Sequence, residues 1–72
     1  MKRMFYKDYC GSVEYSEDDE CWFGKVLGIK SLLTYEGSDP DELRRDFEEC
    51  IDQYLYVCAL HKIKPEPPVC DL

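Results

Sequence analysis

Residues 39–60 read DPDELRRDFEECIDQYLYVCAL and carry the clearest structural signal in the sequence. Asp39 is a preferred N-cap residue, Pro40 suits the first helical position, and Glu42 stands where a capping box places its acid. Apolar residues then recur at the spacing of one buried helix face, at Leu43, Phe47, Cys50, Ile51, Tyr54, Leu55 and Cys58. We therefore predict one long helix over about residues 40–60, ending before Pro65, because a residue that precedes proline leaves the helical region.

Strand patterns precede this helix. Residues 10–16 alternate β-forming and polar side chains, and residues 20–27 are rich in aromatic and aliphatic side chains. The acidic residues 17–19 between them are of turn-forming types, which predicts a hairpin. A third strand is predicted over about residues 32–36, before Gly37.

These elements predict an α+β fold. We expect a two-layer sandwich in which an antiparallel three-stranded meander carries one long helix packed on one face. The chain, residues 1–72, is expected to form a single domain, with an extended proline-rich tail over 63–72. The area scaling of a chain this short leaves a small core, so we expect a homo-oligomer, such as a homodimer, or a permanent partner.

The two faces of the predicted sheet follow from the hairpin register. If Ser16 pairs with Glu20, one face receives Val13, Tyr15, Cys21 and Phe23, and the other receives Glu14, Trp22 and Val26. The third strand adds Leu32 and Thr34 to the first face and Leu33 and Tyr35 to the second. A slip of one residue inverts the assignment. Both faces are then largely apolar and the helix covers one, so the other is expected to be a protein interface.

Charge and composition narrow the function. The formal net charge is −7 and the sequence pI is near 4.5, which disfavours binding to phosphate backbones. No apolar run approaches a membrane span, and the basic N-terminus lacks the apolar segment of a secretory signal, so a cytoplasmic location is expected. The five cysteines lack metal-ligand spacing and are expected to be free thiols.

No motif in the sequence predicts catalysis. His61, the single histidine, stands at the end of the predicted helix, where a cation suits the helix dipole. The sequence contains no nucleophile elbow, P-loop or dinucleotide fingerprint. We therefore expect no enzymatic activity, no cofactor and no metal site, and we expect the acidic turn to be a solvated loop.

Several ordered stretches together closely resemble one protein family. They are GSVEYSEDDECWFGKVLGI at 11–29, YEG at 35–37, DEL at 41–43, FEE at 47–49 and D-x-Y-L at 52–55. This string resembles the N-terminal domain of HicB-family antitoxins over about residues 5–67. The resemblance implies a partial ribonuclease-H-like fold without nuclease activity. It also implies a partner, a HicA-like toxin, which is a small basic ribonuclease that cleaves mRNA.

The resemblance implies a type II antitoxin that covers the active site of its toxin. We expect the turn carboxylates Glu17, Asp18, Asp19 and Glu20 to meet the basic surface of the toxin, and Trp22 or Tyr35 to anchor the dry centre of the interface. Many relatives continue into a DNA-binding domain, but this sequence ends at Leu72, so DNA binding is not expected. Lys62 stands where relatives often carry a glycine that ends the helix.

Two other functions compete with this one. The first is an orphan homo-oligomeric domain without a toxin partner, whose free sheet face pairs with itself. The second is a residual metal-dependent nuclease, suggested by Glu14, Asp18 and Asp19 together with the ancestral fold. Consecutive carboxylates on a turn rarely converge on a cation, which argues against the nuclease.

Overall fold

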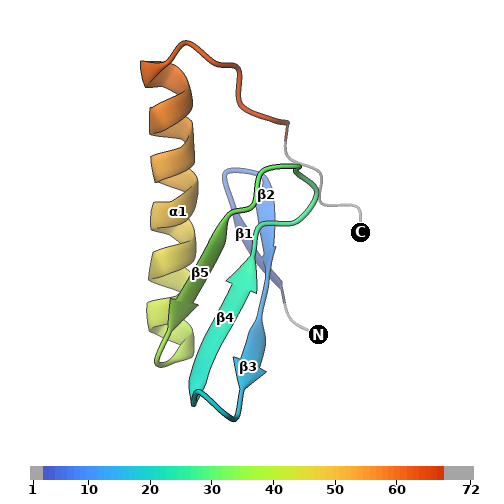
Figure 1. Cartoon of the computed structure of the whole chain (residues 1–72), viewed down its shortest axis with the longest axis vertical. Coiled ribbons are helices and arrows are strands. Elements are labelled where there is room, and N and C mark those ends of the chain that lie inside the picture. The colour runs from blue at the N-terminus through green and yellow to red at the C-terminus, as the bar shows by residue number, and fades with distance from the viewer. Residues whose placement is uncertain (1–2, 68–72) are drawn as a thin grey trace.

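A computed structural model describes residues 3–67 and places one long helix beside a set of short antiparallel strands (Figure 1). The elements follow in the order β1 (Arg3–Tyr6), β2 (Tyr9–Ser12), β3 (Glu14–Ser16), β4 (Cys21–Lys25), β5 (Thr34–Gly37) and α1 (Pro40–Leu60). The predicted α+β class is therefore confirmed. The predicted antiparallel three-stranded meander is present as β3–β4–β5, but the described residues also contain a second antiparallel sheet, β1–β2, that was not predicted.

The N-terminal hairpin was not expected from the sequence. Strands β1 and β2 are joined by a two-residue turn in which Lys7 and Asp8 have positive φ values of 49° and 70°. The primed turns of tight hairpins need this conformation, and glycine or asparagine usually supplies it. The predicted strand over 10–16 is divided at Val13 into β2 and β3. A bridge between Gly11 and Val26 links the two sheets.

The hairpin register differs from the expected one by one residue. Ser16 pairs with Cys21 and not with Glu20, so Tyr15 pairs with Trp22 and Glu14 with Phe23. The face that meets the helix carries Tyr15, Trp22, Gly24, Tyr35 and Gly37, whereas the outer face carries Glu14, Phe23, Lys25, Thr34 and Glu36. The expected apolar outer face is therefore wrong: Phe23 is its one large apolar side chain among these strand positions.

Helix α1 begins and ends where the sequence predicts. The Asp39 side chain accepts a hydrogen bond of 2.8 Å from the backbone N–H of Glu42, and Pro40 occupies the first helical position. Its buried residues are Leu43, Phe47, Ile51 and Cys58. Leu43, Phe47 and Ile51 pack with residues of the strands and of the segment after β4 into one core, because the apolar stripe of the helix lies over the sheet. These partners are Met4, Tyr9, Val26 and Tyr35.

The helix ends in a Schellman motif without glycine. The backbone N–H of Ile63 donates to the carbonyl of Cys58 at 2.7 Å, and that of Lys62 donates to the carbonyl of Ala59 at 3.2 Å. Lys62 has a φ of 55°, which is a left-handed conformation that glycine adopts at lower cost. Residues 63–67 form no helix or strand, and the rest of the predicted tail, 68–72, lies outside the described residues.

The first part of the tail is tied back to the domain by Glu66. Its carboxylate accepts hydrogen bonds from the backbone N–H of Lys30 at 2.7 Å and from the N–H and hydroxyl of Ser31 at 3.0 and 2.7 Å. Its backbone N–H donates to the hydroxyl of Tyr54 at 2.9 Å, and its carbonyl accepts from Tyr9. One residue thus joins the helix, β2 and the loop between β4 and β5.

Replacing Lys62 with glycine should stabilise the protein. Lys62→Gly relieves the strain of the left-handed conformation at the helix end. The free energy gained in this way exceeds the free-energy cost of the extra conformational entropy that glycine gives the unfolded chain. We expect a gain of about 0.5–1 kcal/mol in the free energy of unfolding, measured by urea denaturation. His61→Gly is the control, because His61 has a negative φ of −95° and should lose stability on the same change. Equal effects of the two substitutions on the free energy of unfolding would contradict the conclusion that Lys62 is strained by its left-handed conformation.

The Glu66 contacts should make stability fall in acid. The donors from Lys30 and Ser31 lower the pKa of Glu66 below its ordinary value. A lowered folded-state pKa contributes stability that is present above the unfolded pKa and is lost as the pH falls through the folded one. Glu66→Gln should therefore be less stable than wild type at pH 7, and the difference should shrink below about pH 4. Urea denaturation across this range tests this, with Glu17→Gln as an exposed control.

Candidate protein-binding surface

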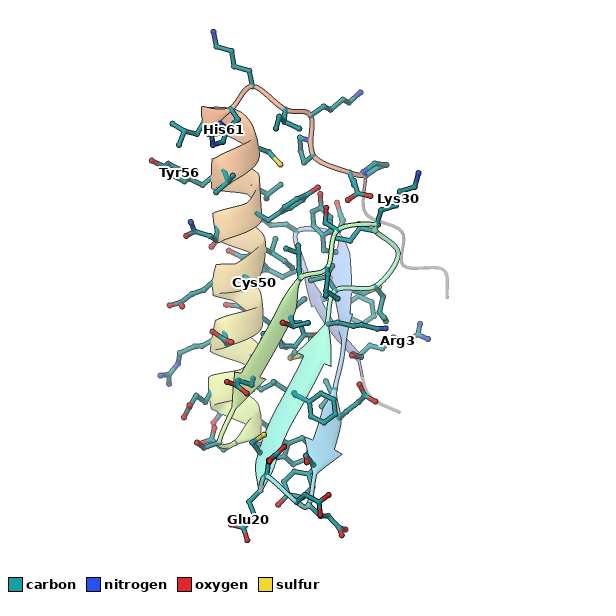
Figure 2. The ribbon with its side chains drawn as sticks, viewed as in Figure 1. Arg3, Glu20, Lys30, Cys50, Tyr56 and His61 are labelled. Carbon is teal, nitrogen blue, oxygen red and sulfur yellow. The ribbon has the colours of Figure 1, made fainter. Side chains whose placement is uncertain are left out.

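The β3–β4 hairpin presents its acidic turn at one end of the molecule. Glu17, Asp18, Asp19 and Glu20 are all exposed, and the turn is held by Ser16, whose hydroxyl accepts from the backbone N–H of Asp19 at 3.3 Å. Glu20 closes the turn with a left-handed φ of 49°. Figure 2 shows the Glu20 side chain projecting from the tip of the hairpin into solvent. The predicted site carboxylates are therefore accessible to a partner.

The start of α1 adds further carboxylates at the same end. Figure 1 shows the hairpin tip and the first turn of α1 at one end of the long axis. An open groove between them is lined by Asp19, Cys21, Glu36, Gly37, Ser38 and Glu42. We name as the acidic end the eight exposed residues Glu17, Asp18, Asp19, Glu20, Glu36, Asp39, Asp41 and Glu42.

The segments that form the acidic end contain no lysine or arginine, although Arg3 and Arg44 lie next to Asp41 at its margin. Eight of the 16 acidic residues of the chain lie there, and the sequence has no lysine or arginine over 8–24 or over 31–43. Charges of one sign gathered on a surface raise the local potential and steer a partner of the opposite sign. Sequence reasoning found the turn but missed Glu36 and Glu42, because only the packing of β5 and α1 brings them to it.

An aromatic pair stands immediately behind the acidic turn. The rings of Tyr15 and Trp22 lie 5.0 Å apart at an interplanar angle of 58°. Trp22 is half-buried against the core, whereas Tyr15 is 48% exposed. Tyrosine and tryptophan next to charged groups are typical of the energetic centres of protein interfaces. Tyr15 therefore lies beside the expected anchor Trp22. The observed hairpin register, which pairs the two residues, would have predicted this contact.

Tyr35, the other expected anchor, belongs to the core. It is 3% exposed, its ring lies 5.1 Å from that of Phe47, and its hydroxyl donates to the carbonyl of Ser12 at 2.7 Å. Burial raises the pKa of the Tyr35 hydroxyl above its ordinary value, so it stays protonated and remains a donor. A side chain enclosed in this way offers no surface to a partner.

The carboxylates are not arranged to hold a metal. Within residues 3–67, no group of three or more histidine, cysteine, aspartate or glutamate side chains is placed to bind an ion, and this includes Glu14, Asp18 and Asp19. His61 caps the far end of α1 and is exposed. None of Cys10, Cys21, Cys50 and Cys58 forms a disulfide in the part of the chain that the structure describes, and Cys70 lies outside it. The acidic end thus offers negative charge and hydrogen-bond acceptors, which are suited to binding.

Comparisons with known proteins add no relative. A scan against protein-family models and searches of curated proteins and solved structures give no match. Among the described residues, no helix is long and apolar enough to span a membrane.

The contact between Tyr35 and Gly11 can be tested by a double-mutant cycle. A Cβ atom on Gly11 would lie 2.1 Å from the Tyr35 hydroxyl oxygen and 2.8 Å from a ring carbon of Phe47. Gly11→Ala should therefore destabilise the protein by about 2 kcal/mol or more, and Tyr35→Phe, which leaves the Ser12 carbonyl without its donor, by about 1–2 kcal/mol. Because Tyr35→Phe removes the closest clash, the double variant should lose less than the two effects added. If urea denaturation shows that the two losses of stability simply add in the double variant, the close packing of Tyr35 against Gly11 is contradicted.

Proposed function

We propose that this chain is an antitoxin-type binding protein that neutralises a small basic ribonuclease of the HicA type in the cytoplasm. The observation that carries the proposal is the acidic end, with its eight exposed carboxylates beside the exposed ring of Tyr15. A ribonuclease that binds RNA must present a basic surface to phosphates. The carboxylates of the acidic end can bind to such a basic surface in place of the RNA phosphates.

The proposed mechanism is occlusion without chemistry. Complementary charge increases the rate of encounter and favours a basic partner over others. The half-buried Trp22 and the neighbouring Tyr15 then supply a rigid apolar contact next to the charged rim. With its RNA-binding surface covered, the ribonuclease cannot place mRNA in its active site. This role needs no cofactor, and it does not require the antitoxin chain to bind DNA.

The string that resembles HicB antitoxins supports the same partner. Its most distinctive part, GSVEYSEDDECWFG at 11–24, runs from the end of β2 through the acidic turn into β4. The residues that carry the resemblance are therefore largely those that build the aromatic pair and the acidic turn. A ribonuclease-H-like relationship of the fold remains part of the proposal.

A charge-reversal experiment tests the electrostatic contact. Asp18→Lys combined with Asp19→Lys should weaken binding to a HicA-type ribonuclease at least tenfold, because it replaces two attractive charges with two repulsive ones. Titration calorimetry gives the affinity, and cleavage of an mRNA substrate in the same samples gives the inhibition. The affinity and the inhibition should both decrease as the salt concentration rises from about 50 to 300 mM, since screening shortens the range of the attraction.

The charge-matched control for this experiment is Glu48→Lys combined with Asp52→Lys. These residues lie on α1, outside the acidic end, and the substitutions change the net charge by the same amount. The control should bind the ribonuclease within about threefold of wild type. Equal losses in both variants would show a nonspecific charge effect, and wild-type protein that neither binds nor inhibits would refute the proposed function.

A further inference from the structure

The C-terminal part of α1 exposes apolar side chains on the side away from the sheet. Tyr56 is 63% exposed, Leu60 62% and Val57 38%. Tyr56 and Leu60 are four residues apart, so they lie on one side of the helix. Figure 2 shows Tyr56 pointing away from the strands. We name Tyr56, Val57 and Leu60 the helix patch.

The described part of the tail does not cover the helix patch. After the helix cap the chain turns toward the sheet side of the molecule, where the Glu66 carboxylate is bonded to Lys30 and Ser31 (Figure 1). The hydroxyl of Tyr54 also holds the backbone of Glu66. The tail is therefore fixed on the side of the helix that faces the strands, and the patch remains accessible to another molecule.

The charges around the helix patch are distributed in a self-complementary way. Exposed Lys62 and Lys64 follow the patch, whereas exposed Glu49 precedes Tyr56 by seven residues. Seven helical residues span about 10 Å along the axis, and Lys62 lies a similar distance beyond Tyr56. A second helix that runs antiparallel, with the Tyr56 residues opposite each other, would bring each Glu49 close to the Lys62 of the other copy. A two-fold axis generates both contacts at once.

We propose that the helix patch binds a second copy of this chain, with the two α1 helices antiparallel about a two-fold axis near Tyr56. The apolar side chains Tyr56 and Leu60 then pack across the axis, and the Glu49–Lys62 pairs form the rim. This interface replaces the outer sheet face on which sequence reasoning placed self-association. It uses none of the acidic end, so it does not depend on the proposed function.

The antiparallel arrangement also limits charge repulsion between the two copies. Each carries a net charge of −7, half of its acidic residues being at the acidic end. A helix of 21 residues is about 31 Å long, so antiparallel helices that overlap in their C-terminal halves hold the acidic ends far apart. This separation is several times the screening length of about 8 Å at physiological ionic strength. A parallel arrangement would place the acidic ends side by side.

Sedimentation equilibrium of the full chain tests the interface. Over a range from about 10 μM to 1 mM, we expect wild type to pass from monomer to dimer, and Leu60→Lys to raise the dissociation constant at least tenfold, because it places a charge in the apolar contact. Leu32→Lys is the matched control. Leu32 is 81% exposed in the loop between β4 and β5, on the other side of the molecule from the patch, and its substitution should leave the dissociation constant unchanged.

A charge exchange tests the orientation. Glu49→Lys and Lys62→Glu should each weaken the dimer several-fold, and the double variant should regain most of the wild-type affinity, because the pair is restored with reversed sign. Circular dichroism confirms that each variant is folded.

Three results would overturn the interface. Wild type that stays monomeric over the whole range excludes it, as do equal effects of Leu60→Lys and Leu32→Lys. Failure of the double variant to recover excludes the antiparallel pairing. If wild type is monomeric and Leu60→Lys instead weakens binding of the basic ribonuclease, the patch belongs to that partner. Variants of the acidic end should leave the dissociation constant of the dimer unchanged. The dimer interface and the proposed function can therefore be refuted independently of each other.

Discussion

The placement of the Tyr35 side chain between two glycines is the constraint on which the rest of the structure depends. Its hydroxyl donates to the carbonyl of Ser12, and a Cβ atom on Gly11 or Gly24 would lie 2.1 or 2.8 Å from the hydroxyl oxygen. The ring also packs against Phe47 of α1. One side chain thereby joins β5, the junction between the two sheets, and the helix. Its polar atom is buried at low cost because the hydrogen bond replaces water.

This constraint determines which surfaces remain for partners. With Tyr35 toward the helix, the register places Trp22 on the same face and Glu36 on the outer one. The free edge of β5 is covered from α1, since Asp46 accepts from the backbone N–H of Glu36 at 2.9 Å and the Cys50 thiol lies 3.8 Å from the carbonyl of Thr34. An edge with side-chain partners is a poor template for an added strand. Binding is therefore expected at the two ends of the molecule and on the exposed side of α1.

The helix could be predicted completely because its signals are local: Asp39 caps it, Pro40 starts it, and the apolar spacing continues to residue 58. Strand β1 could not, because the Lys7–Asp8 turn lacks the glycine or asparagine that marks a tight hairpin. The register of the β3–β4 hairpin is set by tertiary packing around Tyr35, so alternation alone placed it one residue away.

For the site, the turn carboxylates were evident from the sequence. The core position of Tyr35, the exposure of Tyr15 and the contribution of Glu36 all required the register and the path of α1.

The two proposed surfaces lie toward opposite ends of α1, and this separation has a thermodynamic consequence. A chain of 72 residues has a small core, and here it also leaves apolar side chains exposed at one end and gathers eight exposed carboxylates at the other. Each feature is unfavourable in the isolated folded chain, and each is relieved by association with a different partner. Because both partners bind the folded state, each stabilises it by mass action. Since the surfaces share no residue, the two associations can occur together, and an antiparallel dimer would present two outward-facing acidic ends.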